Sequence, residues 1–549
     1  MKYPNTSRAI LKNHSLSDYF EEHNSMKSRS AFFAFSALPM MIVSAQEPIK
    51  SEPLKLSLFD AVQTSLKNNL QVGIARNIRA ATKANELIQD GAFDFNFITS
   101  DNYSKIQSAS ISNSTIQNSP STLITTETNS TRKSRSLTAT LSKAFIWGGT
   151  FQANYLGPNY NSSIVSGTQT ITPISSPSIT SPFGPLPASP FPYTGSFSAS
   201  YTQSLLKGFG PRSAAANYLV SQNNSIASDY TFQQSIIALV SSTENLYWDL
   251  VFATRNFQNK KASLNLAQAQ LKESKVRVEV GILAPIEVTS AEAQVALREQ
   301  DIITAEAQYL NATDALYRAL YPTIQDRPSG IIPTDVPTVE PLVGDPISAI
   351  DLAIQNRVEL KVAELDLKSK EILKSNAFNR MLPQLDVSVG INENSATRST
   401  PTLVREDLTS KRYPGYSFGV TFSIPLLNRA GRGSNAVANA QYRQSELNLQ
   451  DLKLSIRLQV EQAFRNVDAA SRGVNAAQKT RLFTQQDFEA EQKKFQNGMS
   501  TNFLVQSKQN TLDASIANEL QAQINYAKAK TALEQAQGTL LQARGLEIK

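Results

Sequence analysis

The chain contains no cysteine, and its two histidines are His14 and His23. The missing cysteines exclude disulfides and thiolate metal sites. Both histidines precede an expected signal-peptide cleavage site, so the mature chain lacks the commonest general base and the commonest metal ligands. We also find no nucleophile elbow, Walker loop or dinucleotide fingerprint in the sequence. The sequence therefore predicts a protein that is not an enzyme and holds no cofactor and no metal.

Charge clusters and long apolar runs are also missing. The formal net charge is +7 over 549 residues, without a basic run that would suggest nucleic acid as a partner. No stretch after residue 45 reaches the roughly 18 apolar residues that a membrane-spanning helix requires. If the mature chain crosses a membrane, it must therefore do so with elements other than apolar helices.

The N-terminal region has the three parts of a signal peptide. Lys27 and Arg29 form a basic segment, and Ala31 to Val43 is a short, mostly apolar run. Small residues follow, which predicts residues 1–45 as a leader with Sec cleavage after Ala45. Met26 is an alternative start residue. An exported chain without a spanning helix is secreted, periplasmic or inserted in an outer membrane.

Residues 217 positions apart correspond along much of the chain. The matched positions include Gly281 with Gly498, Val288 with Val505, Val295 with Leu512, Tyr309 with Tyr526, and Ala305 with Ala522. A chance heptad pattern would align the alanines, but not also the glycines and tyrosines. The sequence therefore predicts two internal structural repeats, residues 46–321 and 345–549, joined by a proline-rich linker at 322–344.

Each predicted repeat opens with two short helices and ends with two long ones. We expect the short helices at 58–67, 72–90, 347–355 and 358–376, and the long helices at 213–280, 285–320, 434–496 and 502–541. The first and third of the long helices would measure roughly 90–100 Å at 1.5 Å per residue, too long for a compact domain. A heptad seam with alanine at the d positions of 285–320 favours close antiparallel packing of neighbouring helices.

Strict alternation in "SFSASYTQSLL" predicts a strand with one apolar face and one hydroxyl face. Similar patterns predict strands at 93–103, 136–145, 150–156 and 195–206 in the first repeat, and at 384–392 and 415–424 in the second. The Ser/Thr/Asn-rich segments 104–135 and 157–194 are expected to be exposed loops, and 393–414 a polar loop. "WGG" at 147–149 is expected to be a tight turn, because helices on one side of a membrane require an even number of crossings.

The alternation leaves two alternatives, a soluble sheet and a membrane barrel, and the aromatic residues near the strand ends fit both equally well. In a barrel the apolar face would meet lipid and the serine face a wet lumen. The leader and the missing spanning helix favour the barrel. One chain supplies too few strands to close a barrel of usual size, so partner chains are expected.

The duplicated order of elements resembles the TolC family of outer-membrane efflux and secretion channels. The resemblance is carried by "LSLFDAVQTSLKNNLQV", "YTQSLLKGFGPRSAAAN", "VTFSIPLLNRAGRGSNAVANA", "VEVGILAPIEVTSAEAQVAL" and "FQNGMSTNFLVQSKQNTL". It implies an α+β membrane protein: a long antiparallel α-helical barrel, the periplasmic tunnel, continuous with a trimeric transmembrane β-barrel in outer-membrane lipid. It also implies a homotrimer that works with a periplasmic adaptor and an inner-membrane transporter of the RND, ABC or MFS class.

The resemblance also assigns candidate sites. The helix turns would form the closed inner end of the tunnel and dock the adaptor, through Gly281, Pro285, Val288, Gly498, Asn502 and Val505. Ordinary structural turns are the alternative. Glu287 from three chains would form an acidic ring, although a solvated carboxylate at a helix start explains it equally well. Two features differ from the family pattern. Family members often have an acidic residue six positions after each turn glycine, and here Leu504 occupies that place in the second repeat. The family also usually has two strands in each repeat, whereas four are expected in the first repeat here.

The expected function is a passive exit duct of a tripartite efflux pump or type I secretion system, which carries small molecules or polypeptides across the outer membrane. An autonomous porin or surface adhesin is the first alternative, but it would not need such long helices. A soluble coiled-coil scaffold is the second, but it would not explain six alternating strands. The trimer would have eighteen strands from the count here, or twelve from the family resemblance alone.

Overall fold

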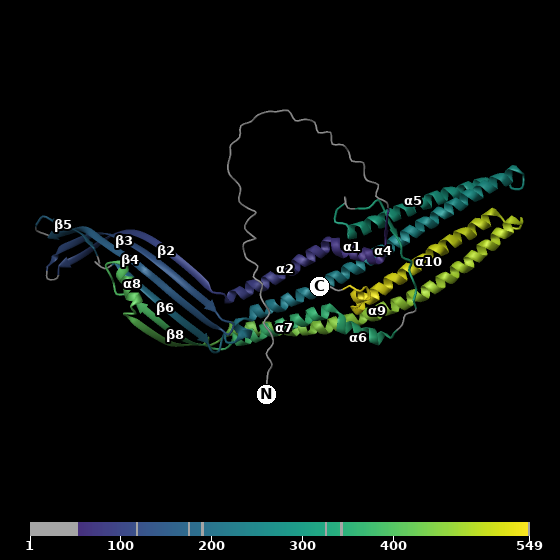
Figure 1. The fold of residues 1–549 in the computed structure, drawn as a ribbon. Helices are drawn as coiled ribbons and strands as arrows, with labels where there is room; N and C mark the ends of the chain where they lie inside the picture. The colour runs from purple at the N-terminus through teal and green to yellow at the C-terminus, as the bar shows by residue number, and fades with distance from the viewer. Residues whose placement is uncertain are drawn as a thin grey trace, which may run out of the picture. The chain divides into compact units, whose positions relative to one another are not determined.

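Long helices and one antiparallel sheet make up most of the chain in the computed structural model, which describes residues 53–116, 119–173, 176–187, 192–323, 327–340 and 344–546 (Figure 1). The expected leader at 1–45 lies outside these residues, as does part of the expected linker. All the described residues belong to one unit, Glu52–Lys549.

Among the described residues, each half of the chain contains two shorter helices followed later by two long ones, and α3, α8 and α11 are additional short helices. The first half contains α1 (Leu58–Asn68), α2 (Leu70–Asp90), α3 (Pro211–Ala214), α4 (Ala216–Glu279) and α5 (Ile286–Leu320). The second contains α6 (Pro346–Asn356), α7 (Val358–Asn379), α8 (Pro401–Thr409), α9 (Arg429–Gln496), α10 (Asn502–Gln537) and α11 (Leu540–Ala543). With 64 and 68 residues, α4 and α9 are each about 100 Å long at 1.5 Å per residue.

Three long helices show the main differences from the expected bounds, and the other helices agree with them to within three residues. The helix expected from 213 is divided into α3 and α4, and α9 begins at Arg429 instead of 434. The helix expected to reach 541 stops at Gln537, because Gly538 takes a left-handed conformation at φ +73° and ends it. The chain then turns into the short helix α11.

One sheet has the strand order β2-β3-β4-β6-β8-β9, with every neighbouring pair antiparallel. Its strands are β2 (Asn96–Ile116), β3 (Ser119–Ala144), β4 (Gly149–Pro173), β6 (Tyr193–Ser204), β8 (Gln384–Asn394) and β9 (Pro414–Ser423). A further strand, β5 (Ile179–Pro187), pairs only with β4. Separately, β1 (Leu54–Leu56) pairs in parallel with β7 (Ile331–Pro333).

The loops expected at 104–135 and 157–194 were a wrong prediction, because most of these residues extend β2, β3 and β4 or form β5. Their hydroxyl side chains pair across strands, as in Ser104–Ser134 and Ser108–Ser130, each 2.7 Å between Oγ atoms. A polar composition therefore did not imply a loop, since threonine favours strands and cross-strand hydroxyl pairs support the ladder. The expected loop at 393–414 likewise contains α8.

The first strand starts at Asn96 instead of 93, after a 3₁₀ turn at Gly91–Phe93.

The turn between β3 and β4 lies at the helix end of the sheet. The Phe145 N–H donates to the Gly149 carbonyl at 2.8 Å, and Gly148 has φ +92°. The Gly210 N–H, just before α3, donates to the Trp147 carbonyl at 3.1 Å. The β3–β4 hairpin therefore has its tip beside the helices, and its two open ends, at Ser119 and Pro173, lie at the far end of the sheet.

Apolar side chains from both halves pack between the helices. The cluster around Tyr247 and Leu316 joins α1, α4, α5 and α10 with the small β1–β7 sheet. A second cluster, around Ile456 and Val460, joins α6, α9 and α10. Along α5 the seam alanines Ala291 and Ala305 are buried, which brings the backbones of neighbouring helices close together.

Candidate functional site

The turn between α4 and α5 is built on Gly281. Its φ of +79° places it in the left-handed region, its N–H donates to the Val278 carbonyl, and the Ile282 N–H donates to the Arg277 carbonyl at 2.9 Å. These two bonds are the Schellman arrangement, which satisfies the carbonyls at the end of α4. Pro285 is the N-cap of α5, which begins at Ile286. The chain therefore reverses within a few residues because only glycine adopts this conformation without strain.

The turn between α9 and α10 has the same geometry at Gly498. Its φ is +75°, and the Met499 N–H donates to the Lys494 carbonyl at 2.9 Å. Glu491, near the end of α9, accepts a hydrogen bond from Ser500 Oγ at 2.5 Å and lies 3.0 Å from Lys494 Nζ. These two donors, Ser500 first, lower the pKa of the Glu491 carboxyl group. The ionised glutamate ties the residues after the turn back to α9.

The two turns are connected near their tips. The Arg277 guanidinium of α4 lies over the Phe495 ring of α9, 5.0 Å from its centroid. Asn502 and Val505 of α10 are each 3% exposed, and they line a small cavity together with α4 residues that include Gln270 and Ser274. The structure therefore places Asn502 and Val505 in the packing between the hairpins and not on a surface.

The remaining residues expected at the turns lie differently. Gly281, Pro285 and Gly498 are exposed, while Val288 and Glu287 are half-buried. In the described part of the chain, Glu287 forms no ion pair. Leu504, at the matching place in the second half, is 43% exposed.

Four exposed apolar residues at the tips were missed from the sequence. They are each about 70% exposed: Ile282, Ile286, Met499 and Phe503. Each of the first two lies 217 positions before one of the others, so the repeat offset would have identified them. Large apolar side chains held in solvent at both turns are typical of a surface that a partner covers.

A buried ion-pair network lies at mid-length of the helices. Glu244 of α4 is fully buried and accepts two hydrogen bonds from the Arg544 guanidinium, at 2.7 and 2.9 Å, and one from Thr531 Oγ1 at 2.6 Å. Arg544 also lies 2.9 Å from Glu534, whose pKa is raised mainly by burial. The network connects the C-terminal segment to α4.

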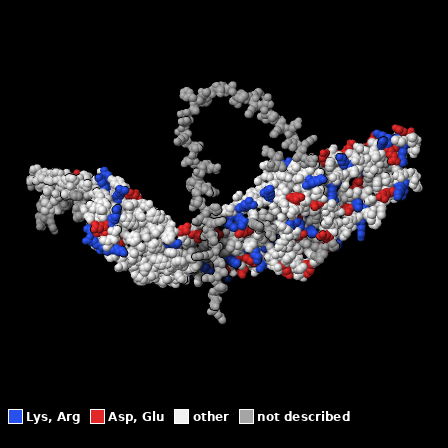
Figure 2. Space-filling view, in the orientation of Figure 1, with Lys and Arg blue, Asp and Glu red and all other residues white. Residues whose placement is uncertain are grey.

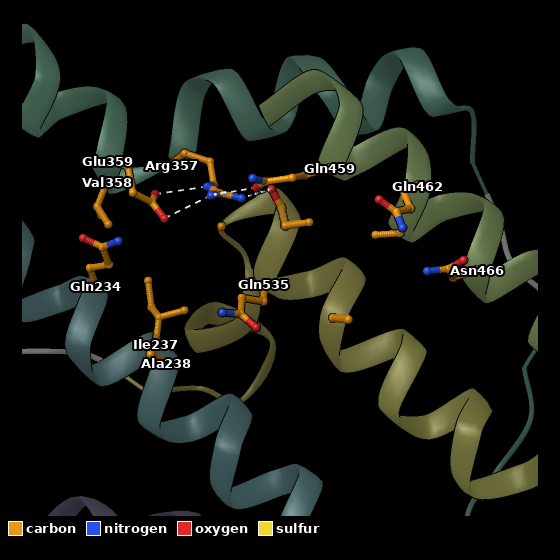
Figure 3. Close-up of a pocket in the computed structure, with 14 residues that line it drawn as sticks. Gln234, Ile237, Ala238, Arg357, Val358, Glu359, Gln459, Gln462, Asn466 and Gln535 are labelled. Atoms are coloured by element: carbon orange, nitrogen blue, oxygen red, sulfur yellow. Dashed lines mark hydrogen bonds and ion pairs between the residues drawn. The ribbon is translucent and has the colours of Figure 1, made fainter. Parts of the chain in front are cut away.

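A cavity of about 360 Å³ opens between α4, α9, α10 and the start of α7 (Figure 3). Amide side chains converge on it from α4, α9 and α10: Gln234, Gln459, Gln462, Asn466 and Gln535. Arg357 forms two 3.0 Å contacts with Glu359 and donates to the Ala536 carbonyl at the end of α10. The positive charge of Arg357 is therefore paired with the Glu359 carboxylate of the same chain. In the part of the chain that the structure describes, no group of side chains could hold a metal ion.

The two faces of the sheet have opposite character. One row of paired residues crosses all six strands and is apolar throughout: Phe97, Leu141, Ala153, Ala199, Ile391 and Tyr416. A row on the other face is polar or glycine: Asn96, Ser142, Gln152, Ser200, Gly390 and Ser417. Phe97 and Tyr416, on the two outer strands, are 65% and 85% exposed, so among the described residues this row is left open to solvent at both ends.

Charged residues border this apolar face. On β3, Lys143 lies over the Phe95 ring at the helix end, and Arg135 pairs with Asp101 at 2.6 Å toward the far end. From Lys143 to Arg135 the strand advances about 27 Å at 3.4 Å per residue, comparable with the roughly 25 Å apolar band of an outer-membrane barrel. Figure 2 shows a charge-poor band over the sheet, bordered by a cluster of Lys and Arg on the side away from the helices.

A six-stranded sheet with one continuous apolar face, joined to helical hairpins about 100 Å long, defines a channel protein of the outer-membrane class. No helix among the described residues is long and apolar enough to span a membrane. The chain belongs to the outer membrane efflux protein family, whose model matches residues 194–320 and 349–539. Members of this family are outer-membrane channels that extend into the periplasm, and the protein is accordingly an outer-membrane protein.

Individual relatives agree with this assignment. The chain is 24% identical to the outer membrane protein TolC of Escherichia coli K12 over 323 residues, 57% of this chain and 64% of that protein. The fold is similar to the CmeC channel of Campylobacter jejuni, with a TM-score of 0.60, 14% identity and coverage of 88% of this chain and 86% of CmeC. It is also similar to VceC of Vibrio cholerae, with a TM-score of 0.59, 13% identity and coverage of 88% and 96%. The sequence match spans less than two thirds of TolC.

Proposed function

We propose that the chain is the passive exit duct of a tripartite efflux pump or a type I secretion system. The observation that carries the proposal is the apolar row across all six strands of a sheet that adjoins the long helices. One chain thus has a lipid-facing part and helices long enough to reach far into the periplasm. The proposal includes no catalysis, so the energy for transport comes from a partner.

The duct needs three copies of the chain. Within the described residues, β2 and β9 form the two edges of the six-stranded sheet, and an open edge is costly in lipid. The two strands run in opposite directions, so β9 of one copy can pair with the first part of β2 of the next. Six strands from each of three copies give a barrel of eighteen, wide enough for an aqueous channel.

The helix turns are the proposed contact with the periplasmic adaptor. The exposed apolar residues Ile282, Ile286, Met499 and Phe503 supply the area for such a contact, and Gly281 and Gly498 set the shape of the turns. An inner-membrane transporter of the RND, ABC or MFS class would complete the assembly. The transported substrate, small molecule or polypeptide, depends on that transporter.

Glu287 is the proposed charge at the aperture. Three copies would place three carboxylates around the inner opening and favour cations. We expect Glu287→Gln to lower the cation selectivity of single channels in planar bilayers. Glu292→Gln is the matched control, because Glu292 is on the same helix and pairs with Lys275 at 3.1 Å. Unchanged selectivity in Glu287→Gln would exclude the ring.

The proposal as a whole is tested by membrane fractionation, crosslinking and conductance. We expect the full-length protein in the outer-membrane fraction, a crosslinked trimer after detergent extraction, and discrete conductance steps in planar bilayers. Deleting the gene should raise cellular retention of an exported compound or polypeptide. A water-soluble monomer without conductance would overturn the proposal.

A further inference from the structure

Two lysines lie directly opposite each other at the far end of the apolar face. Lys105 of β2 pairs in register with Lys133 of β3, and Tyr103 pairs with Arg135 one step closer to the helices on the same face. We call Lys105, Lys133 and Arg135 the basic edge. Directly opposed residues of an antiparallel pair are about 5 Å apart, and like charges at that distance destabilise the sheet.

Nothing in the described part of the chain compensates the two lysines. Asp101 is the neighbouring carboxylate on this face, and it is already engaged by Arg135 through contacts of 2.6 and 3.1 Å. Neither Lys105 nor Lys133 forms an ion pair or a side-chain hydrogen bond with another described residue. Lys105 and Lys133 are therefore available to bind an anion from outside the chain.

The surroundings of the basic edge restrict what this anion can be. On the helix side lies the exposed apolar face with Phe97, and Tyr103 stands between, 65% exposed. Two more tyrosines pack 5.3 Å apart: Tyr193 at the far end of β6, and Tyr160 of β4, which pairs in register with Arg135. Tyrosines beside an apolar band are typical of a membrane–water interface. An anion joined to an apolar chain would satisfy the lysines and the apolar face together.

We propose that the basic edge binds a phosphorylated glycolipid of the outer leaflet of the outer membrane. A phosphomonoester carries nearly two negative charges and three acceptor oxygens, so one such group can bridge two opposed ammonium groups. The acyl chains of the same lipid would cover the apolar face below. This assignment rests on the proposed function, because it takes the end of the sheet remote from the helices to be the outer one.

The test uses full-length protein purified in detergent, with bis-phosphorylated lipid A in mixed micelles as the probe. The readout is the lipid concentration that gives half of the maximal rise in melting temperature. We expect Lys105→Gln/Lys133→Gln to raise this concentration about 20-fold, from the loss of two basic residues near the lipid phosphates. Lys105→Arg/Lys133→Arg keeps both charges and should restore binding.

Lys143→Gln is the matched control, since Lys143 is on β3 and on the same face but at the helix end. Equal half-saturation in wild type and Lys105→Gln/Lys133→Gln would overturn the proposal. So would an equal loss in Lys143→Gln, or an equal melting shift from inorganic phosphate at matched phosphate concentration. Wild-type conductance in bilayers of phosphatidylcholine, which contain no lipid A, reports separately on the proposed function.

Discussion

At the scale of single residues, matched positions in the two halves differ in burial. Glu244 of α4 and Glu461 of α9 are 217 positions apart. Glu244 is fully buried and held by Arg544, whereas the side chain of Glu461 is 28% exposed and lies 3.1 Å from Arg457. The same residue type at matched positions is therefore part of a buried network in α4 and of a surface ion pair in α9.

We expect Glu244→Gln to destabilise the helical part by about 3 kcal/mol, because it leaves the half-buried Arg544 and Thr531 without their ionised acceptor. Glu461→Gln, the matched control, should cost less than about 1 kcal/mol, since exposed ion pairs contribute little. Thermal unfolding followed by circular dichroism in detergent measures both variants. Equal melting temperatures would contradict the role assigned to Glu244.

The turn glycines give a second prediction at this scale. Gly281→Val or Gly498→Val forces a β-branched residue to a φ near +80°, at a cost of about 1–3 kcal/mol of backbone strain. We expect export to be lost while the protein still inserts in the outer membrane. Gly473→Val is the control, because Gly473 lies within α9 with open space around it and without a positive φ. Normal export in both turn variants would count against the turns as a docking site.

At the scale of elements, the position of the β3–β4 turn distinguishes a spanning hairpin from an external one. The turn lies beside the start of α3, so a spanning hairpin places it on the periplasmic side. We expect Gly149→Cys to resist an impermeant thiol reagent in intact cells. Ser112→Cys, far out on β2, should be labelled readily. Strong labelling of Gly149→Cys with an intact outer membrane would exclude six spanning strands.

At the scale of the whole molecule, closure of the barrel depends on contacts between chains. We expect cysteines at Thr99 of β2 and at one position between Tyr416 and Phe422 of β9 to form a covalent trimer, because the two edges run antiparallel. Thr140→Cys on β3, which is paired on both sides within the chain, is the control and should give no crosslink to β9. Open ladders longer than a trimer would show that the copies do not close.

The sequence by itself determined much of the helical architecture. Heptad periodicity and glycine stops depend on local geometry, so α4, α5 and α9 begin and end within a few residues of the expected bounds. Alternation gave each strand its apolar face for the same local reason. The local pattern failed at 104–135 and 157–194, where polar composition suggested loops, because the pairing that makes these residues strands lies in other segments of the chain.

Only the tertiary structure decided which residues meet. The burial of Asn502 and Val505, the exposure of Ile286 and Phe503, and the opposition of Lys105 to Lys133 follow from packing and register between distant segments. Periodicity identifies the apolar side of an element but not the partner it packs against or the register of pairing. The continuous apolar row was therefore visible strand by strand in the sequence, but its extent across six strands required the observed strand order.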